Sequence, residues 1–151
     1  MFWGCFSWRG VGPLVRVDGM MDSNIYINTL AKYFIPWVQP LVEQDADLIF
    51  QQDNASIHTS VYSKWWMNTH GFHILDWPAH SPDFNPIENL WDIVDTHVRK
   101  RKNKPTNMDE LAAAVVEEWN NLPIETIHNL IESMMRRVQA GIDAKGWHTK
   151  Y

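Results

Sequence analysis

Hydrophobic and polar residues follow two different spacings along the chain, and the first of them predicts strands. Apolar runs at 2–8 and 13–17 lie on either side of a glycine-rich turn at 9–12, which predicts a β-hairpin. Two further strands are predicted at Leu48–Gln52 and Phe72–Trp77, because each is a short apolar run followed by turn-forming residues. The first half of the chain is therefore expected to contain a sheet.

The second spacing is helical, with apolar residues three or four positions apart. One helix is predicted from Ser23, its expected N-cap, to about Gln44, and Pro36 and Pro40 should kink or segment it. Other helices are expected at 60–70, 86–102, 108–119 and 124–138. The pattern thus predicts a single α/β domain over residues 1–151 with a helical C-terminal end.

Composition narrows the class of protein. The 151 residues are 45% hydrophobic and 21% charged, which is typical of a globular domain and excludes a disordered chain. The net charge of −5 excludes binding of nucleic acid by bulk positive charge, although a local basic patch remains compatible with it. The single cysteine, Cys5, excludes an internal disulfide framework and fits a reducing compartment.

No apolar run reaches the roughly 18 residues that a membrane span requires, and no signal peptide is visible at the N-terminus. We therefore expect an intracellular protein with no membrane partner.

Two acidic residues are placed where catalytic carboxylates can lie. Asp53 follows the predicted strand Leu48–Gln52, and Glu88 opens the helix that begins at Pro86, with 34 residues between the two. Strand ends are where ligands gather on α/β sheets. Paired carboxylates can hold Mg²⁺, and a two-metal site can cleave a phosphodiester.

Each carboxylate also has a purely structural interpretation. Asn85, Pro86 and Glu88 fit the N-cap, N1 and N3 positions of a helix, and Asp53 is a common turn former. Spacing alone does not decide between these interpretations.

Longer sequence motifs favour the catalytic interpretation of Asp53 and Glu88. Segments 51–59 (QQDNASIHT) and 75–91 (LDWPAHSPDFNPIENLW) closely resemble the Tc1/mariner family of DDE transposases. The opening segment 3–7 (WGCFS) is similar to that family's second strand. The resemblance covers essentially the whole chain.

The resemblance implies an RNase H-like fold, with a mixed sheet flanked by helices. It also implies a two-metal site of three carboxylates that binds Mg²⁺ or Mn²⁺, to which this chain contributes Asp53 and Glu88 as catalytic metal ligands. The implied activity is DNA cleavage at transposon ends followed by strand transfer to target DNA. DNA is the implied partner and the nucleus the implied location, and a homodimer is also compatible with the family.

The match departs from the family at its N-terminal side. The family's first catalytic Asp lies on a first strand that this chain is expected to lack, together with the N-terminal helix-turn-helix domains. Asp18 and Asp22 follow the hairpin and do not match that motif, so we reject them as substitutes. We expect the isolated chain to lack DNA cleavage activity and to be poorly stable, because the missing strand would leave its neighbours with open edges.

Other residues are weaker candidates for DNA contact. His58 matches the family motif and could touch a phosphate, although a histidine that hydrogen-bonds the loop is the alternative. A basic cluster could contact DNA phosphates or simply be a solvated helix end; it consists of Arg99, Lys100, Arg101, Lys102 and Lys104.

Two alternatives to a transposase catalytic domain remain open at this point. One is a domesticated, non-catalytic module that binds DNA or protein, and the other is a different two-metal nuclease of the RNase H-like fold.

Overall fold

The structure is a computed structural model that describes residues 1–44, 48–78, 81 and 84–145. It divides the chain into two compact units. The first contains residues 1–4 and 15–81, and the second contains residues 5–14 and 82–151. Each unit is described below by itself.

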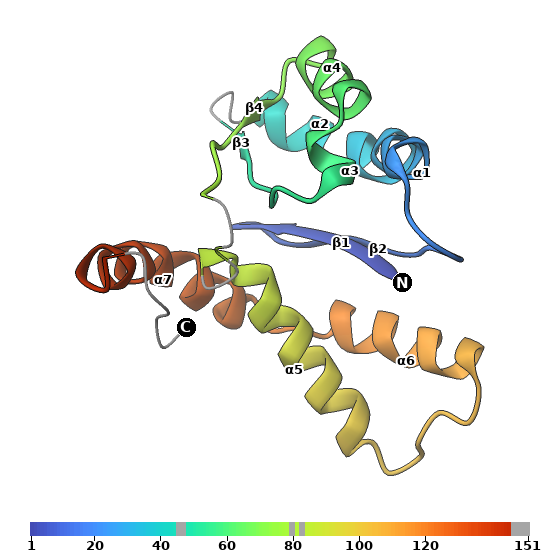
Figure 1. Cartoon of the computed structure of the whole chain (residues 1–151). Helices are drawn as coiled ribbons and strands as arrows, with labels where there is room; N and C mark the ends of the chain where they lie inside the picture. Colours follow the sequence, from blue (N-terminus) through green and yellow to red (C-terminus); the bar gives the residue numbers. More distant parts are fainter. Residues whose placement is uncertain (45–47, 79–80, 82–83, 146–151) are drawn as a thin grey trace. The chain divides into compact units, whose positions relative to one another are not determined.

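The N-terminal hairpin belongs partly to each unit. It consists of β1 (Phe2–Ser7) and β2 (Gly10–Arg16), which pair with each other (Figure 1). The predicted hairpin is confirmed, but its turn is shorter than expected. Gly10 has a positive φ of 126°, so the chain turns sharply there and the following residues already belong to the second strand.

The first unit is built around a long interrupted helix. The segments are α1 (Ser23–Thr29), the π-helical turn η1 (Leu30–Phe34) and α2 (Ile35–Gln44). The side chain of Asp22, rather than that of the predicted cap Ser23, accepts the Ile25 N–H at 2.8 Å.

The wide turn lies directly before Pro36, and there the Ile35 N–H bonds to the Leu30 carbonyl. A proline ring clashes with the carbonyl four residues earlier, and the wider turn makes room for it. The predicted interruption is thus confirmed at Pro36, whereas α2 continues through Pro40.

A short parallel strand pair and two helices complete the first unit. Strand β3 (Ile49–Phe50) pairs with β4 (His73–Ile74), in the register Ile49 to His73. Helices α3 (Ser56–Thr59) and α4 (Val61–Thr69) lie between the strands in sequence. Both predicted strands are in the expected places, but only two residues of each pair with the other strand. Helix α3 was not predicted.

Aromatic and aliphatic side chains form the core of this unit. Phe34 is central, with its ring 5.0 Å from that of Phe50 and 5.3 Å from that of Phe72. Trp66 is buried and Trp65 on the same helix is 58% exposed, so the predicted division of this pair between core and surface is confirmed.

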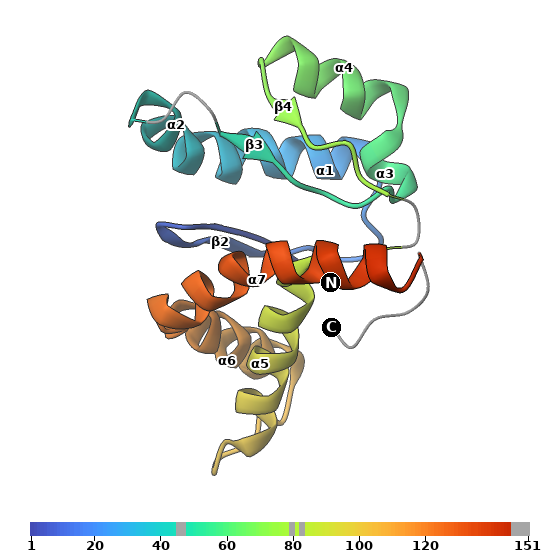
Figure 2. The same ribbon diagram turned by 90° about the vertical axis from the view of Figure 1, so that its left-hand side faces the viewer.

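The second unit is a group of three helices, α5 (Pro86–Lys100), α6 (Met108–Asn120) and α7 (Ile124–Asp143) (Figure 2). All three predicted helices are confirmed to within a few residues at their ends. Their shared core includes Leu90, Val94, Val98, Ala114, Trp119 and Leu122.

The hairpin tip joins this helical group. Trp119 is fully buried and its Nε1 donates to the Gly12 carbonyl at 3.0 Å. The ring of Trp8 stacks on that of His128 with centroids 3.9 Å apart, and His128 Nε2 lies 2.9 Å from the Trp8 carbonyl oxygen. The second unit therefore requires residues from both ends of the sequence.

Within the described residues the strands form two separate two-stranded sheets, one a hairpin and the other a parallel pair. No helix in this part of the chain is both long enough and apolar enough to cross a membrane.

Candidate functional site

Asp53 lies in a loop that begins where β3 ends, as predicted. Two hydrogen bonds fix this loop on either side of Asp53. The hydroxyl of buried Tyr26 donates to Gln52 Oε1 at 2.5 Å, and Asn54 Nδ2 donates to the Trp77 carbonyl at 2.7 Å. The loop is thus tied to α1 and to the segment after β4, which holds the backbone of Asp53 in place.

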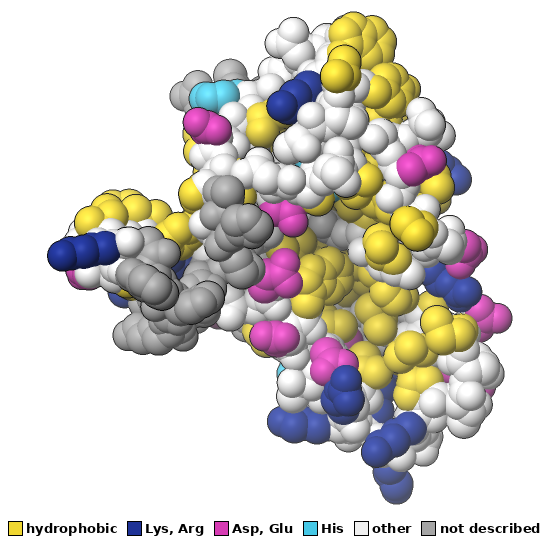
Figure 3. Space-filling model, in the orientation of Figure 1, with side chains coloured by type: hydrophobic (Ala, Val, Ile, Leu, Met, Phe, Trp, Pro, Cys, Tyr) yellow, Lys and Arg dark blue, Asp and Glu magenta, His cyan; other side chains and the backbone are white. Residues whose placement is uncertain are grey.

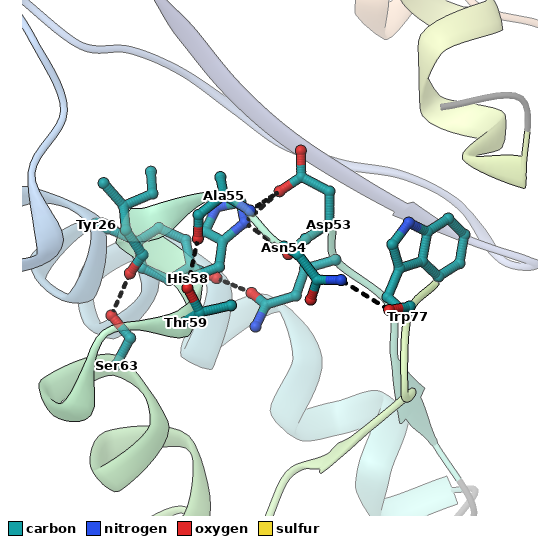
Figure 4. Close-up of polar contacts among 10 residues, drawn as sticks. Tyr26, Asp53, Asn54, Ala55, His58, Thr59, Ser63 and Trp77 are labelled. Atoms are coloured by element: carbon teal, nitrogen blue, oxygen red, sulfur yellow. Dashed lines mark hydrogen bonds and ion pairs between the residues drawn. The ribbon is translucent and has the colours of Figure 1, made fainter. Parts of the chain in front are cut away.

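The carboxylate of Asp53 has one engaged oxygen and one open oxygen (Figure 4). Oδ1 accepts the Ala55 N–H at 3.0 Å and lies 2.7 Å from His58 Nδ1. Oδ2 accepts no hydrogen bond from any residue in the described ranges, and the side chain is 55% exposed. Asp53 therefore presents one fixed, accessible oxygen to solvent.

His58 orients this carboxylate from α3. Because a carboxylate oxygen can only accept, Nδ1 of His58 carries the proton in their hydrogen bond. The imidazole is 17% exposed, and its centroid lies 4.6 Å from that of Tyr26. His58 thus makes the loop hydrogen bond that the structural interpretation predicted, and it does so to the candidate catalytic residue itself. Its contact with DNA stays a prediction.

Glu88 lies in the first turn of α5, as predicted. Asn85 caps the helix, because its Oδ1 accepts the Ile87 N–H at 3.4 Å, and Pro86 is buried at the first helical position. The Glu88 N–H donates to the Asn85 carbonyl at 3.2 Å, while the residue itself is exposed. A negative charge in the first turn of a helix is also stabilised by its interaction with the positive end of the helix dipole. The predicted cap is therefore confirmed, and it leaves Glu88 at an exposed helix start.

Asp53 belongs to the first unit and Glu88 to the second. Among the described residues, no three His, Cys, Asp or Glu side chains are grouped closely enough to hold a metal ion together. The open oxygen of Asp53 is a hard donor of the type that Mg²⁺ and Mn²⁺ prefer, so this residue fits one position in the coordination shell of such an ion.

The basic cluster at the end of α5 is partly neutralised. Arg99 Nε bonds to Asp95 Oδ2 at 2.7 Å. Arg101 pairs with Glu117 and also with Glu118, the latter at 2.9 Å, and so links α5 to α6. Hydrogen bonds to these carboxylates raise the pKa of both guanidinium groups, so neither arginine loses its charge at physiological pH.

Three lysines of the cluster are exposed and form no ion pair within the part of the chain that the structure describes. We call them the lysine cluster: Lys100, Lys102 and Lys104. Figure 3 shows basic side chains gathered at the end of α5 and over the loop that follows it. The two arginines have a structural role in addition to any contact with DNA.

The sequence pattern did not single out the residues that hold Asp53. Tyr26 lies on an apolar helical stripe, a position typical of an ordinary core residue, and only its hydroxyl bond to Gln52 shows its link to the site. Asn54 directly follows Asp53 in the sequence motif, and this position was the available signal. Its partner, the Trp77 carbonyl, is a backbone group that no sequence pattern marks.

Comparisons with known proteins show what the chain is similar to. The profile of the DDE superfamily endonuclease family matches residues 18–112. The transposase of transposable element Tcb2 from Caenorhabditis briggsae is 41% identical over 153 residues, and the Tc1 transposase of Caenorhabditis elegans is 40% identical over 151 residues. Both alignments cover 100% of this chain but 54% of the relative, so the chain spans about half the length of the curated relatives it matches.

Solved structures confirm the fold. The Mos1 transposase catalytic domain, solved with raltegravir and Mg, aligns with a TM-score of 0.85 over 97% of this chain and 75% of that chain. The crystal structure of the catalytic domain of Mos1 mariner transposase aligns with a TM-score of 0.82 over 97% of this chain and 74% of that one. Both are only 18% identical to this chain, and at that identity the close superposition establishes its fold alone, which is RNase H-like.

The motifs around Asp53 and Glu88, the family profile and the relatives at about 40% identity all lead to the same assignment. The chain belongs to the DDE superfamily endonuclease family and, within it, to the Tc1/mariner transposase catalytic domains.

Proposed function

We propose that this chain is the catalytic part of a Tc1-like DNA transposase, which cleaves DNA at transposon ends and transfers the freed ends to target DNA in the nucleus. The observation that carries the proposal is Asp53, which is fixed at the end of β3 by His58 and the Ala55 N–H while its Oδ2 stays open. A carboxylate held in this way is preorganised to bind a cation without first losing side-chain freedom.

Asp53 and Glu88 are the residues that would hold Mg²⁺ or Mn²⁺. The Mos1 catalytic domain has been solved with Mn and with Mg, which supports this choice of metal. When bound, such ions supply activation of a water or hydroxyl and stabilisation of the leaving oxygen of a phosphodiester. Asp53 and Glu88 contribute negative charge and oxygen ligands, and His58 keeps the Asp53 carboxylate in one orientation.

DNA is the proposed substrate. Mos1 transposase has been solved in a paired-end complex with the left transposon end, which supports DNA as the ligand of this fold. In this chain the lysine cluster offers three positive charges that are not neutralised within the described part of the chain, and such charges favour contact with phosphates.

A chimera tests the function directly. The half of the Caenorhabditis elegans Tc1 transposase that aligns with this chain is replaced by the chain, and excision of a Tc1 element is measured. We expect excision with the unchanged chain and its loss, by at least 100-fold, with Asp53→Asn or Glu88→Gln, because each removes a charged ligand. The matched control is Asp92→Asn, an exposed carboxylate one turn further along α5, which should retain activity.

Excision that persists with Asp53→Asn would refute the assignment of Asp53. Loss of excision with Asp92→Asn to the same extent would show that the assay reports general damage to α5 rather than removal of a metal ligand.

A further inference from the structure

One face of α7 lies against the start of α5. Residues 133, 137 and 141 are four positions apart, so they follow one side of the helix. All three are buried, and two of them contact residues on either side of Glu88. Both ribbon views show α7 next to the beginning of α5 (Figures 1 and 2). This face lies outside the segment matched by the family profile.

Arg137 provides the first of these contacts. Its side chain reaches Asn89, where the guanidinium Nη2 donates to Oδ1 at 2.6 Å. Its Nε donates to Ser133 Oγ at 2.8 Å, and that hydroxyl donates to the Leu130 carbonyl at 2.6 Å. The guanidinium is thus held by its own helix and bonded to the residue that follows Glu88.

Arg137 is 2% exposed, although arginine is among the residues least often buried. A buried charge is tolerated only when hydrogen bonds compensate its lost hydration. Its neighbour Arg136 is exposed on the same helix. The bonds to Ser133 and Asn89 are part of this compensation, and burial shields them from competing water.

Gly141 provides the second contact. The ring of Phe84 packs so closely on it that a Cβ at this position would lie 2.4 Å from Phe84 Cζ. Phe84 directly precedes Asn85, the residue that caps α5. Helix α7 therefore holds the chain at residue 84 and again at residue 89, and Glu88 lies between these two points.

We propose that Arg137 is a positioning residue for Glu88. It holds the first turn of α5 through Asn89 and thereby fixes where the Glu88 carboxylate is presented. The metal-binding part of this inference rests on the proposed function, in which Glu88 is a metal ligand. Groups that orient a metal ligand typically change metal affinity by 10- to 100-fold when they are removed.

Two measurements on the purified chain test the proposal. The first is amide hydrogen exchange at residues 88–91, compared with exchange in α6. The second is Mn²⁺ affinity, measured by the electron paramagnetic resonance signal of the free ion. The variants are Arg137→Met, which keeps most of the apolar stem, Arg137→Lys, and Asn89→Ala, which removes the acceptor on α5. Arg136→Met is the matched control.

We expect Arg137→Met and Asn89→Ala to speed exchange at 88–91 at least tenfold more than in α6 and to weaken Mn²⁺ binding about tenfold. Arg137→Lys should restore part of both, because a lysine can still donate to Asn89. Arg136→Met should change either quantity by less than twofold. Exchange at 88–91 that stays at the value of the unchanged chain in both Arg137→Met and Asn89→Ala would overturn the proposal. Equal acceleration in α6 would also overturn it, because Arg137 would then act on general stability.

Glu88→Gln separates this proposal from the proposed function. If Mn²⁺ binds equally well to Glu88→Gln and to the unchanged chain, Glu88 is not a metal ligand and the proposed function fails. The exchange measurement then still decides whether Arg137 holds the turn. If Glu88→Gln weakens binding and Arg137→Met does not, the proposed function stands and the positioning role of Arg137 is refuted.

Discussion

Replacement of Trp119 by phenylalanine should destabilise the chain by roughly 2–4 kcal/mol, and the value follows from two contacts of the buried indole. Its Nε1 donates to the Gly12 carbonyl at 3.0 Å in a buried setting. Phenylalanine has no donor, and an unpaired buried carbonyl costs about 1–3 kcal/mol. The smaller ring also loses packing contacts and leaves a small cavity, which adds about 1 kcal/mol.

Urea unfolding followed by far-ultraviolet circular dichroism measures this change, since nine tryptophans make fluorescence difficult to assign. Trp91→Phe is the informative comparison. The Trp91 ring stacks on Trp119 with centroids 4.9 Å apart, so this variant alters the stack and leaves the hydrogen bond to Gly12 intact. Trp65→Phe is a surface control, because this side chain is 58% exposed, and it should change stability by less than about 0.5 kcal/mol.

A cost below about 1 kcal/mol for Trp119→Phe, or a cost no larger than that of Trp91→Phe, would refute this expectation. In either case the bond between the hairpin and α6 would contribute little to stability. A lower m-value without a change in midpoint would instead indicate that cooperative unfolding has been lost.

Three further predictions concern other parts of the molecule. Gly141→Ala should lower the urea midpoint, because its Cβ would lie 2.4 Å from the Phe84 ring. In a Phe84→Ala background, which lacks that ring, the same change should be neutral or stabilising relative to Phe84→Ala alone, since alanine favours helix by about 1 kcal/mol over glycine. A raised midpoint for Gly141→Ala in the otherwise unchanged chain would contradict this. Hydrogen bonds hold the pKa of Glu110 below its ordinary value of 4.5, and the strongest of them comes from the backbone N–H of Thr106. The contribution of the Glu110 carboxylate to stability is therefore complete above pH 4.5, and it is lost as the pH falls through the lower pKa of the folded state. The urea midpoint should therefore depend less on pH over this acidic range in Glu110→Gln, and an unchanged dependence would exclude the effect. Charge reversal across the lysine cluster should weaken DNA binding and reduce the slope of log affinity against log salt by up to about 3, whereas Lys64→Glu on α4 should have little effect; an unchanged slope would exclude phosphate contact by the cluster.

Local signals in the sequence predicted most elements of the fold. Asn85 and Pro86 marked the start of α5, and the apolar stripe through Leu90, Val94 and Val98 marked its buried face. The π-helical turn was predicted only as an interruption near Pro36, because the pattern shows where a helix is strained and does not show how the backbone relieves the strain. Helix α3 has four residues, too few for a period to be recognised.

The candidate site was predictable in part. Asp53 and Glu88 were found because motifs surround them, and both lie where the sequence placed them, at a strand end and in a first helical turn. Arg137 gave no such signal. It lies among residues of an amphipathic helix, and an arginine there is normally solvated; only the fold shows that this one is buried against Asn89.

The hairpin tip has a consequence for the order in which the protein folds during synthesis. Its partners lie far along the chain, with 107 positions between Gly12 and Trp119 and 120 between Trp8 and His128. At about 5–20 residues per second, a ribosome adds His128 roughly 6–24 s after Trp8. The hairpin tip must therefore wait, with the Trp8 ring uncovered, until α7 is being made. A chaperone that binds nascent aromatic segments would have its greatest effect in this interval.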